Sequence, residues 1–204
     1  MEYVFFLRGT FSNWAPSKFT LGGSQFTQNE QFMMHSKALL FNAPETAEKI
    51  LATGNPKEQK ALGRQVPDFN KDTWNKHARD LVYAGAWAKF EQNPKLKEEL
   101  LTTSGKTLVE AASYDPVWGI GLNEVQAKGT IPAQWKGTNW LGGVLTQLRE
   151  DLIADPAAAK TRALSIVEGL HSGSMPAPYF PVASETLHFP TTVLAKERES
   201  EKNL

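Results

Sequence analysis

Cysteine is missing altogether from this chain of 204 residues. Without cysteine the protein has no disulfide, no thiolate nucleophile and no cysteine-based zinc site. The four histidines are His35, His77, His171 and His188, and they also lack the spacing that is typical of metal ligands. We therefore predict that the protein binds no metal and no other cofactor.

An excess of charge of either sign is missing as well. The chain has 22 lysines and arginines and 22 aspartates and glutamates, which gives a formal net charge of +0 at pH 7. This balance excludes a chain-wide footprint for duplex DNA, whereas a local basic patch or a small nucleotide-like ligand is compatible with it. No stretch approaches the ~20 apolar residues of a membrane span. We expect a monomer, free of membranes, in the cytoplasm or the nucleus.

What is present is the composition of an ordinary globular protein, with 41% hydrophobic and 22% charged residues. The pattern predicts an α+β fold that is mostly α-helical, with a small antiparallel β-sheet near the N-terminus. Strands are expected at 3–7, 18–21, 24–26 and 107–112, with a tight turn at Gly22-Gly23. Helices are expected to start near Thr27, Asn42–Pro44, Asn55-Pro56, Asp72, Asn93-Pro94, Asn139 and Asp155-Pro156.

The chain divides into three predicted parts. Residues 1–155 are expected to form one domain, and residues 156–172 a C-terminal helix. Residues 173–204 are Pro-rich and then charged, a composition typical of an extended or disordered segment.

One segment places two opposite charges where a helix should be apolar. Thr27 followed by Glu30 is typical of a capping box, so we expect a helix to begin here. Residues seven apart lie on nearly the same line of a helix surface, and Glu30 and Lys37 therefore share a face. Their neighbours on it are Met33, Met34, Leu40 and Phe41, and the polar side is expected around Gln31, His35 and Ser36.

Two interpretations of this pair are open. In the structural one, Glu30 bonds back to the Thr27 amide, and Lys37 runs its aliphatic stem over the methionines to put its ammonium in water. In the functional one, a carboxylate and an amine inside an apolar wedge are paired, desolvated or used in chemistry.

The loop at 115–122 is the second informative segment. Glycines at Gly119 and Gly121 let the backbone approach a ligand, and Trp118 offers a flat surface for stacking. A core tryptophan in a turn is the alternative.

Polar residues at two other places are further candidates. Asn139 stands at a predicted helix start, where a cap leaves backbone amides free to bind phosphate, or where it serves as a cap alone. Arg8, Ser12 and Asn13 leave the first strand and enter a turn, and a plain turn explains them equally well.

In this order the segments resemble the NADAR family of NAD- and ADP-ribose-associated proteins, between residues 11 and 152. The helix from Thr27 to Lys37 matches the family's threonine-x-x-glutamate helix, with the lysine at the same spacing. Gln31 replaces the histidine that often follows the glutamate, and residues beyond about 155 have no counterpart. The other matching motifs are Phe11-Ser12-Asn13, Leu62-Gly63-Arg64, Trp74, Lys89-Phe90, Leu108-Val109-Glu110, Asp115 with Trp118-Gly119 and Gly121, and Asn139 with Leu141-Gly142.

The resemblance implies an N-glycosidase that hydrolyses the bond between ribose C1 and the nitrogen of a base or amine. Some members are similar to enzymes that destroy phosphorylated aminopyrimidine intermediates of riboflavin synthesis, and others remove ADP-ribose from guanine in nucleic acid. The second type fits this chain slightly better, so the expected partner is ADP-ribose or ADP-ribosylated guanine in DNA or RNA. A non-catalytic ADP-ribose-binding module and a nucleic-acid-binding module are the rival classes.

The resemblance, with the helix pattern, also implies roles for the candidate residues. Lys37 is expected to attack as a neutral amine and form an iminium with the ring-opened ribose, while Glu30 moves the protons. Asp115 is expected to bind ribose hydroxyls or help with proton transfer. In the alternative mechanism Lys37 is purely electrostatic and Glu30 activates water. The substrate-binding residues are expected to be Arg8, Ser12, Asn13, Trp118, Gly119, Gly121 and Asn139.

Overall fold

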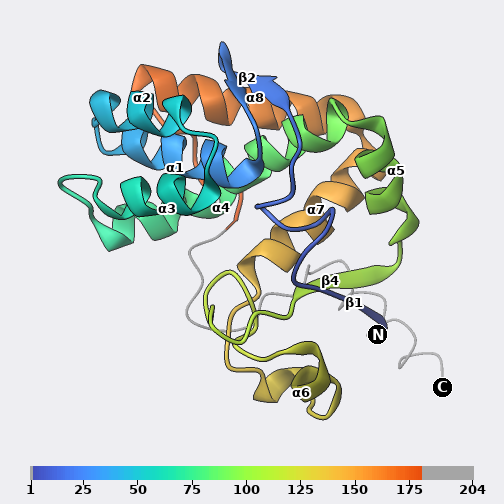
Figure 1. The fold of residues 1–204 in the computed structure, drawn as a ribbon. Helices are drawn as coiled ribbons and strands as arrows, with labels where there is room; N and C mark the ends of the chain where they lie inside the picture. Colours follow the sequence, from blue (N-terminus) through green and yellow to red (C-terminus); the bar gives the residue numbers. More distant parts are fainter. Residues whose placement is uncertain (1, 181–204) are drawn as a thin grey trace.

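The long helix α4 (Lys71–Glu91) runs through the hydrophobic core of the computed structural model, which describes residues 2–180. The other helices are α1 (Asn29–Leu40), α2 (Pro44–Ala52), α3 (Pro56–Arg64), α5 (Pro94–Thr102), α6 (Glu124–Lys128), α7 (Trp140–Ala154) and α8 (Pro156–Ser172), with one 3-10 turn at Pro132–Gln134. Helices α1, α5, α7 and α8 pack around α4 (Figure 1), so every residue from His77 to Phe90 is buried.

Proline at the first position starts four helices in the described part of the chain. Its fixed φ suits that position, and its missing N–H would have no partner there in any case. In two of the four, the residue before the proline completes the cap. Asn55 and Asp155 each accept hydrogen bonds from first-turn backbone N–H groups at 3.0 Å. The starts of α2, α3, α5 and α8 predicted from the sequence are thereby confirmed.

Strands β1 (Glu2–Phe6) and β4 (Lys106–Glu110) form a parallel pair in which Phe6 lies opposite Glu110. The mostly helical α+β class is confirmed, and the parallel pair is an addition to the antiparallel sheet that the sequence predicts. Five helices lie between the two strands in the sequence, and a long crossover of this kind permits parallel pairing. The carboxyl ends of both strands therefore meet at one edge.

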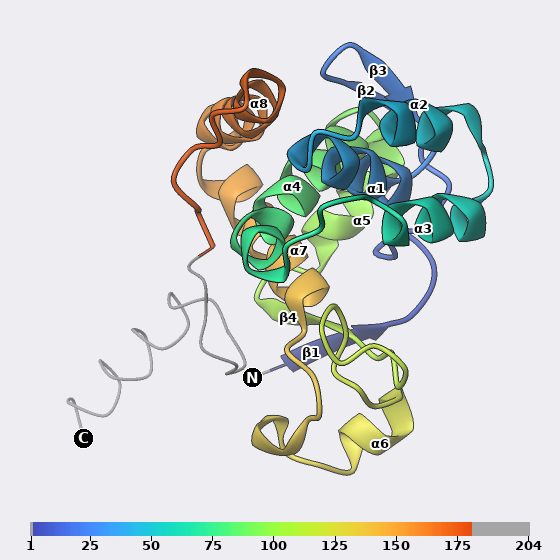
Figure 2. The same cartoon turned by 90° about the vertical axis from the view of Figure 1, so that its left-hand side faces the viewer.

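The antiparallel pairing expected near the N-terminus is found in the hairpin of β2 (Phe19–Leu21) and β3 (Ser24–Phe26). Gly22 and Gly23 join the strands with φ angles of 58° and 80°, as a two-residue turn of the mirror-image type requires. This hairpin lies at one end of the molecule, whereas β1, β4 and α6 lie at the other (Figures 1 and 2).

Helix α1 starts at Asn29 without the predicted capping box. The backbone N–H of Thr27 donates to the side-chain oxygen of Gln31 at 2.8 Å, and the N-cap residue Gln28 makes no side-chain cap bond. The Gln31 side chain thus accepts the hydrogen bond from the Thr27 N–H that the sequence pattern assigned to Glu30. The carboxyl group of Glu30 is left without a capping role.

The predicted polar side of α1 is wrong as well. Gln31, His35 and Ser36 are all buried, because α2, α3, α4 and α8 pack around this helix. The Gln31 amide donates to backbone carbonyls around the end of α2. Burial and the nearby His171 lower the pKa of His35 to about 4. In this helix, polar residues therefore do not indicate which face contacts solvent.

Helix α8 shares the core of the rest of the protein. Its residues Ala159, Ala163 and Ile166 belong to the main hydrophobic cluster, and the helix packs against α4 and α7. The helix predicted at 156–172 is present, while the predicted domain boundaries stay predictions. The extension predicted at 173–204 lies outside the described residues after position 180. No helix in residues 2–180 is long and apolar enough to cross a membrane.

Candidate active site

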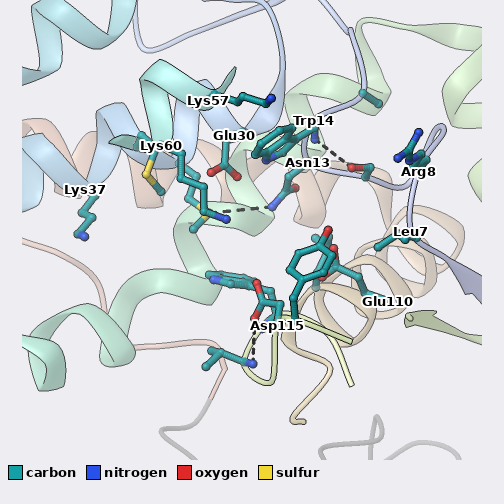
Figure 3. A pocket seen from close by; sticks show the side chains of 18 of the residues that line it. Leu7, Arg8, Asn13, Trp14, Glu30, Lys37, Lys57, Lys60, Glu110 and Asp115 are labelled. Carbon is teal, nitrogen blue, oxygen red and sulfur yellow. Dashed lines mark hydrogen bonds between the residues drawn. The ribbon is translucent and has the colours of Figure 1, made fainter. Parts of the chain in front are cut away.

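A cavity of about 1370 Å³ opens between the N-terminal turn, α1, α3 and the loop after β4. Seven of the ten predicted site residues line it, and they come from the turn after β1, from α1 and from the loop after β4. They are Arg8, Ser12, Asn13, Glu30, Lys37, Asp115 and Trp118. Figure 3 shows Glu30 near the centre, Lys37 to one side of it, and Asp115 and Glu110 on the opposite wall.

Glu30 is the buried acid of the cavity, with only 4% of its surface exposed. Desolvation raises the pKa of its carboxyl group, and the Asp115 charge raises it further. Lys60, a hydrogen bond from Trp14 and Arg64 act in the opposite direction. One carboxyl oxygen has no hydrogen-bond partner within the protein. A buried acid that lines a cavity is suited to proton transfer.

Lys37 is half-buried and lies against α3 and the start of α4. Its ammonium donates to the Gly63 carbonyl at 2.8 Å and lies 4.1 Å from the centroid of the Phe69 ring. Desolvation lowers the pKa of Lys37, and the nearby Arg64 charge lowers it further. No ion pair joins it to Glu30 among residues 2–180. The two groups share a cavity without neutralising each other.

Glu110 is a third acid in the cavity. It ends β4, so the parallel pairing places it at the same edge as Arg8, which follows β1. Burial, with the charges of Asp115 and Glu30, raises the pKa of Glu110 to about 8. At neutral pH this carboxyl group is therefore mostly protonated, and a protonated carboxyl donates a hydrogen bond.

Asp115 and Trp118 belong to one turn of the loop after β4. The Asp115 carboxylate accepts hydrogen bonds from the backbone N–H groups of Val117 and Trp118, at 3.0 and 2.9 Å. The Trp118 ring is partly buried and meets the Trp140 ring edge to face, with 5.6 Å between centroids. The loop thus holds a carboxylate and an aromatic ring at fixed places on the cavity wall.

The turn after β1 is held by a buried lysine from α4. The Lys89 ammonium donates to the carbonyls of Thr10 and Ser12, at 2.6 and 2.9 Å. Burial lowers the pKa of Lys89 to about 7. The Asn13 side chain in turn accepts from Asn29 at 2.9 Å, which fixes the turn to the start of α1.

Three predicted site residues lie outside the cavity lining. Asn139 does not cap α7 with its side chain, so that expectation is wrong. Its buried amide instead accepts from the Glu110 N–H at 2.9 Å and donates to the Leu108 carbonyl at 3.0 Å. Gly119 and Gly121 serve close packing, since an added Cβ would lie 2.9 Å from the Glu110 carbonyl and 3.0 Å from Lys136, respectively.

The lining residues that received no role from the sequence include Glu110, Lys60, Arg64 and Trp14. Lys60 and Arg64 both lower the pKa of Glu30 from α3. A signal for Glu110 was present, because it lies near the end of the strand predicted at 107–112, and sites often lie at strand ends in parallel sheets. Among residues 2–180, no three His, Cys, Asp or Glu side chains are arranged to hold a metal ion.

Comparison with known proteins assigns the chain that forms this cavity to a family. The NADAR domain model matches residues 6–153. N-glycosidase R617 of Acanthamoeba polyphaga mimivirus is 43% identical over 146 residues, covering 69% of this chain and 86% of the relative. The chloroplastic riboflavin biosynthesis protein PYRR of Arabidopsis thaliana is 29% identical over 146 residues, which are 65% of this chain and 22% of that protein.

The fold agrees with that of a solved relative. The NMR structure of the E. coli protein YbiA matches with a TM-score of 0.63 and 26% sequence identity, covering 76% of this chain and 87% of YbiA. The match of the domain model takes in all seven predicted residues that line the cavity. The chain therefore belongs to the NADAR family.

Proposed function

We propose that this cavity hydrolyses the N-glycosidic bond between a ribose C1 and a guanine nitrogen, and so removes ADP-ribose from nucleic acid. The observation that carries the proposal is the presence, in one cavity, of an amine and a carboxyl group with opposite pKa shifts. Burial lowers the pKa of Lys37 and raises that of Glu30. These opposite shifts favour the neutral amine, which is the nucleophilic form, and the neutral carboxyl group, which is the proton-donating form. The relative R617, itself named an N-glycosidase, supports this bond type.

In the first step the neutral Lys37 amine attacks C1 of the ribose. The C1–N bond to guanine and the C1–O bond of the sugar ring break, and an iminium forms between Lys37 and C1. The protonated Glu30 carboxyl gives one proton, and the amine loses another. These two protons go to the guanine nitrogen and to the ring oxygen. The iminium charge is balanced by the new Glu30 carboxylate.

In the second step water hydrolyses the iminium. The Glu30 carboxylate takes a proton from the attacking water, and the new hydroxyl forms on C1. The C1–N bond to Lys37 breaks, the sugar ring closes again, and Lys37 and Glu30 return to their starting protonation states. The products are free ADP-ribose and unmodified guanine.

The surroundings of Lys37 act on this chemistry in both directions. The bond to the Gly63 carbonyl and the contact with the Phe69 ring favour the ammonium form, whereas burial and Arg64 favour the neutral amine. If the ammonium form prevailed throughout the cycle, Lys37 would act only as a charge. Glu30 would then activate water directly at an oxocarbenium-like C1.

The cavity supports a large substrate. Its volume of about 1370 Å³ exceeds the roughly 300–1,000 Å³ of a pocket for one small ligand. ADP-ribose with an attached guanine uses such a space better than a phosphorylated aminopyrimidine riboside. With this substrate in the cavity, Trp118 stacks on one of the substrate's rings, Asp115 and Glu110 bind ribose hydroxyls, and Arg8 binds phosphate. The riboflavin-pathway substrate is the second candidate, because the relative PYRR carries that pathway in its name.

An activity screen by mass spectrometry tests the proposal. Purified protein is incubated with an oligonucleotide that carries ADP-ribosylated guanine and, separately, with phosphorylated riboflavin-pathway intermediates. We expect the oligonucleotide to lose the mass of ADP-ribose, and the Glu30→Gln variant to leave it intact. Cleavage of the riboflavin intermediates alone would overturn the substrate assignment. Binding of ADP-ribose without cleavage of either substrate would make the protein a binding module.

A further inference from the structure

The rim of the cavity along α3 carries a row of basic side chains. Lys57, Lys60 and Arg64 stand at positions i, i+3 and i+7 of the helix, so they share one face, and all three line the cavity. The row is about 10 Å long at the rise of an α-helix. Lys71, the first residue of α4, adds a further cation to the lining.

These rim cations form no ion pair within the part of the chain that the structure describes. Within residues 2–180, none of the ion pairs involves Lys57, Arg64 or Lys71, and all three side chains are exposed. The whole chain has a formal net charge of +0, so this concentration of cations at one place does not reflect its overall charge. Exposed cations around a cavity mouth attract an anionic ligand.

Two exposed aromatic rings accompany the basic rim. Trp14 and Phe69 are 39% and 44% exposed, and both line the cavity. Each has a lysine above its ring, Lys60 at 5.7 Å from the Trp14 centroid and Lys37 at 4.1 Å from the Phe69 centroid. A basic groove combined with exposed aromatic rings is the arrangement that binds single-stranded nucleic acid, in which rings stack on bases and cations contact phosphates.

We propose that Lys57, Arg64 and Lys71 bind consecutive backbone phosphates of a single strand of nucleic acid, with Trp14 and Phe69 stacking on its bases. This inference rests on the proposed function, because the modified guanine of that strand enters the cavity. The diphosphate of ADP-ribose is too compact to contact the whole row of cations, which is about 10 Å long. Part of the rim therefore remains free to bind other phosphates when ADP-ribose is bound. A base must leave the duplex stack to reach such a cavity, which explains the preference for a single strand.

Two measurements test the rim, one of them independent of turnover. Fluorescence anisotropy measures the binding of an unmodified single-stranded oligonucleotide to wild-type protein and to the double variant Lys57→Gln/Lys71→Gln. Each phosphate contact contributes about 0.7 to the slope of log K against log salt for a single strand, so we expect the slope to fall by about 1.4. The matched control is Lys49→Gln/Lys160→Gln, which removes two exposed lysines of α2 and α8 that do not line the cavity.

The second measurement compares KM for ADP-ribosylated guanosine with KM for the same modification within an oligonucleotide. We expect the oligonucleotide to have the lower KM, and the rim variant to lose most of that advantage while the control variant keeps it. Equal KM values in the wild type, or no binding of the unmodified strand at low salt, would overturn the inference while leaving the proposed function intact. Strand binding that depends on the rim, without cleavage of either substrate, would instead overturn the proposed function alone.

Discussion

Replacing Glu110 by glutamine should change how the stability of the protein depends on pH. In the folded protein the pKa of Glu110 is raised to about 8 from its ordinary value of 4.5, first by desolvation and then by the Asp115 and Glu30 charges. Between these two pH values the folded state holds a proton that the unfolded state has lost. The free energy of unfolding therefore falls as pH rises from about 4.5 to about 8.

The size of this effect follows from the pKa. The interval from 4.5 to about 8, at about 1.36 kcal/mol for each pH unit, corresponds to about 5 kcal/mol. Glu110 is partly exposed and lines the cavity, and water there reduces the desolvation. We therefore expect roughly 2–5 kcal/mol of stability to be lost across this interval through Glu110.

Urea denaturation at pH 5, 6, 7 and 8 measures this loss as the difference between the wild type and Glu110→Gln. The stability of the variant relative to the wild type should rise steadily from pH 5 to pH 8. The new amide changes the absolute stability, since one buried Glu110 oxygen has no partner in the protein, but an amide does not titrate. Glu98→Gln, which removes an exposed charge from α5, should show no such rise. A difference between the wild type and Glu110→Gln that stays constant with pH would show that Glu110 does not hold its proton across this range.

Three other perturbations have defined outcomes. Free ADP-ribose should raise the melting temperature, and Trp118→Ala should reduce that shift more than it reduces stability; the reverse order would place the ring in the core alone. EDTA should leave turnover unchanged, because the chain has no cysteine and no paired histidines, and a loss restored by magnesium or zinc would contradict this. Gly85→Ala should lower the free energy of unfolding by about 1–3 kcal/mol or more, because the new Cβ would lie 2.0 Å from the Asn29 side chain. An unchanged melting temperature would show that α1 and α4 can separate freely.

Local chemistry made much of the fold predictable. Prolines after Asn55, Asn93 and Asp155 indicated helix starts, because proline at the first position and a polar cap act within one turn. The Gly22-Gly23 turn was equally local. The position of Glu30 and Lys37 on one face of α1 followed from helical spacing.

Long-range contacts decided what the sequence left open. The parallel register of β1 and β4 depends on how five intervening helices pack, and this register brings Glu110 to the cavity. Asn139 was expected to cap α7, but its amide is taken by the backbone of β4, a partner 29 and 31 residues away in the chain. The buried Gln31 shows the same limit, because its partners lie on and after α2.

Borohydride trapping during turnover tests most directly whether Lys37 carries the reaction at this cavity. We expect borohydride to reduce the iminium and to leave an adduct of ADP-ribose size on the peptide that holds Lys37. Lys37→Arg keeps the charge but cannot form the iminium, so it should be as inactive as Lys37→Ala while both variants still bind ADP-ribose. Substantial activity of Lys37→Arg, with nothing trapped in the wild type, would contradict the covalent route and replace it with attack by water through Glu30.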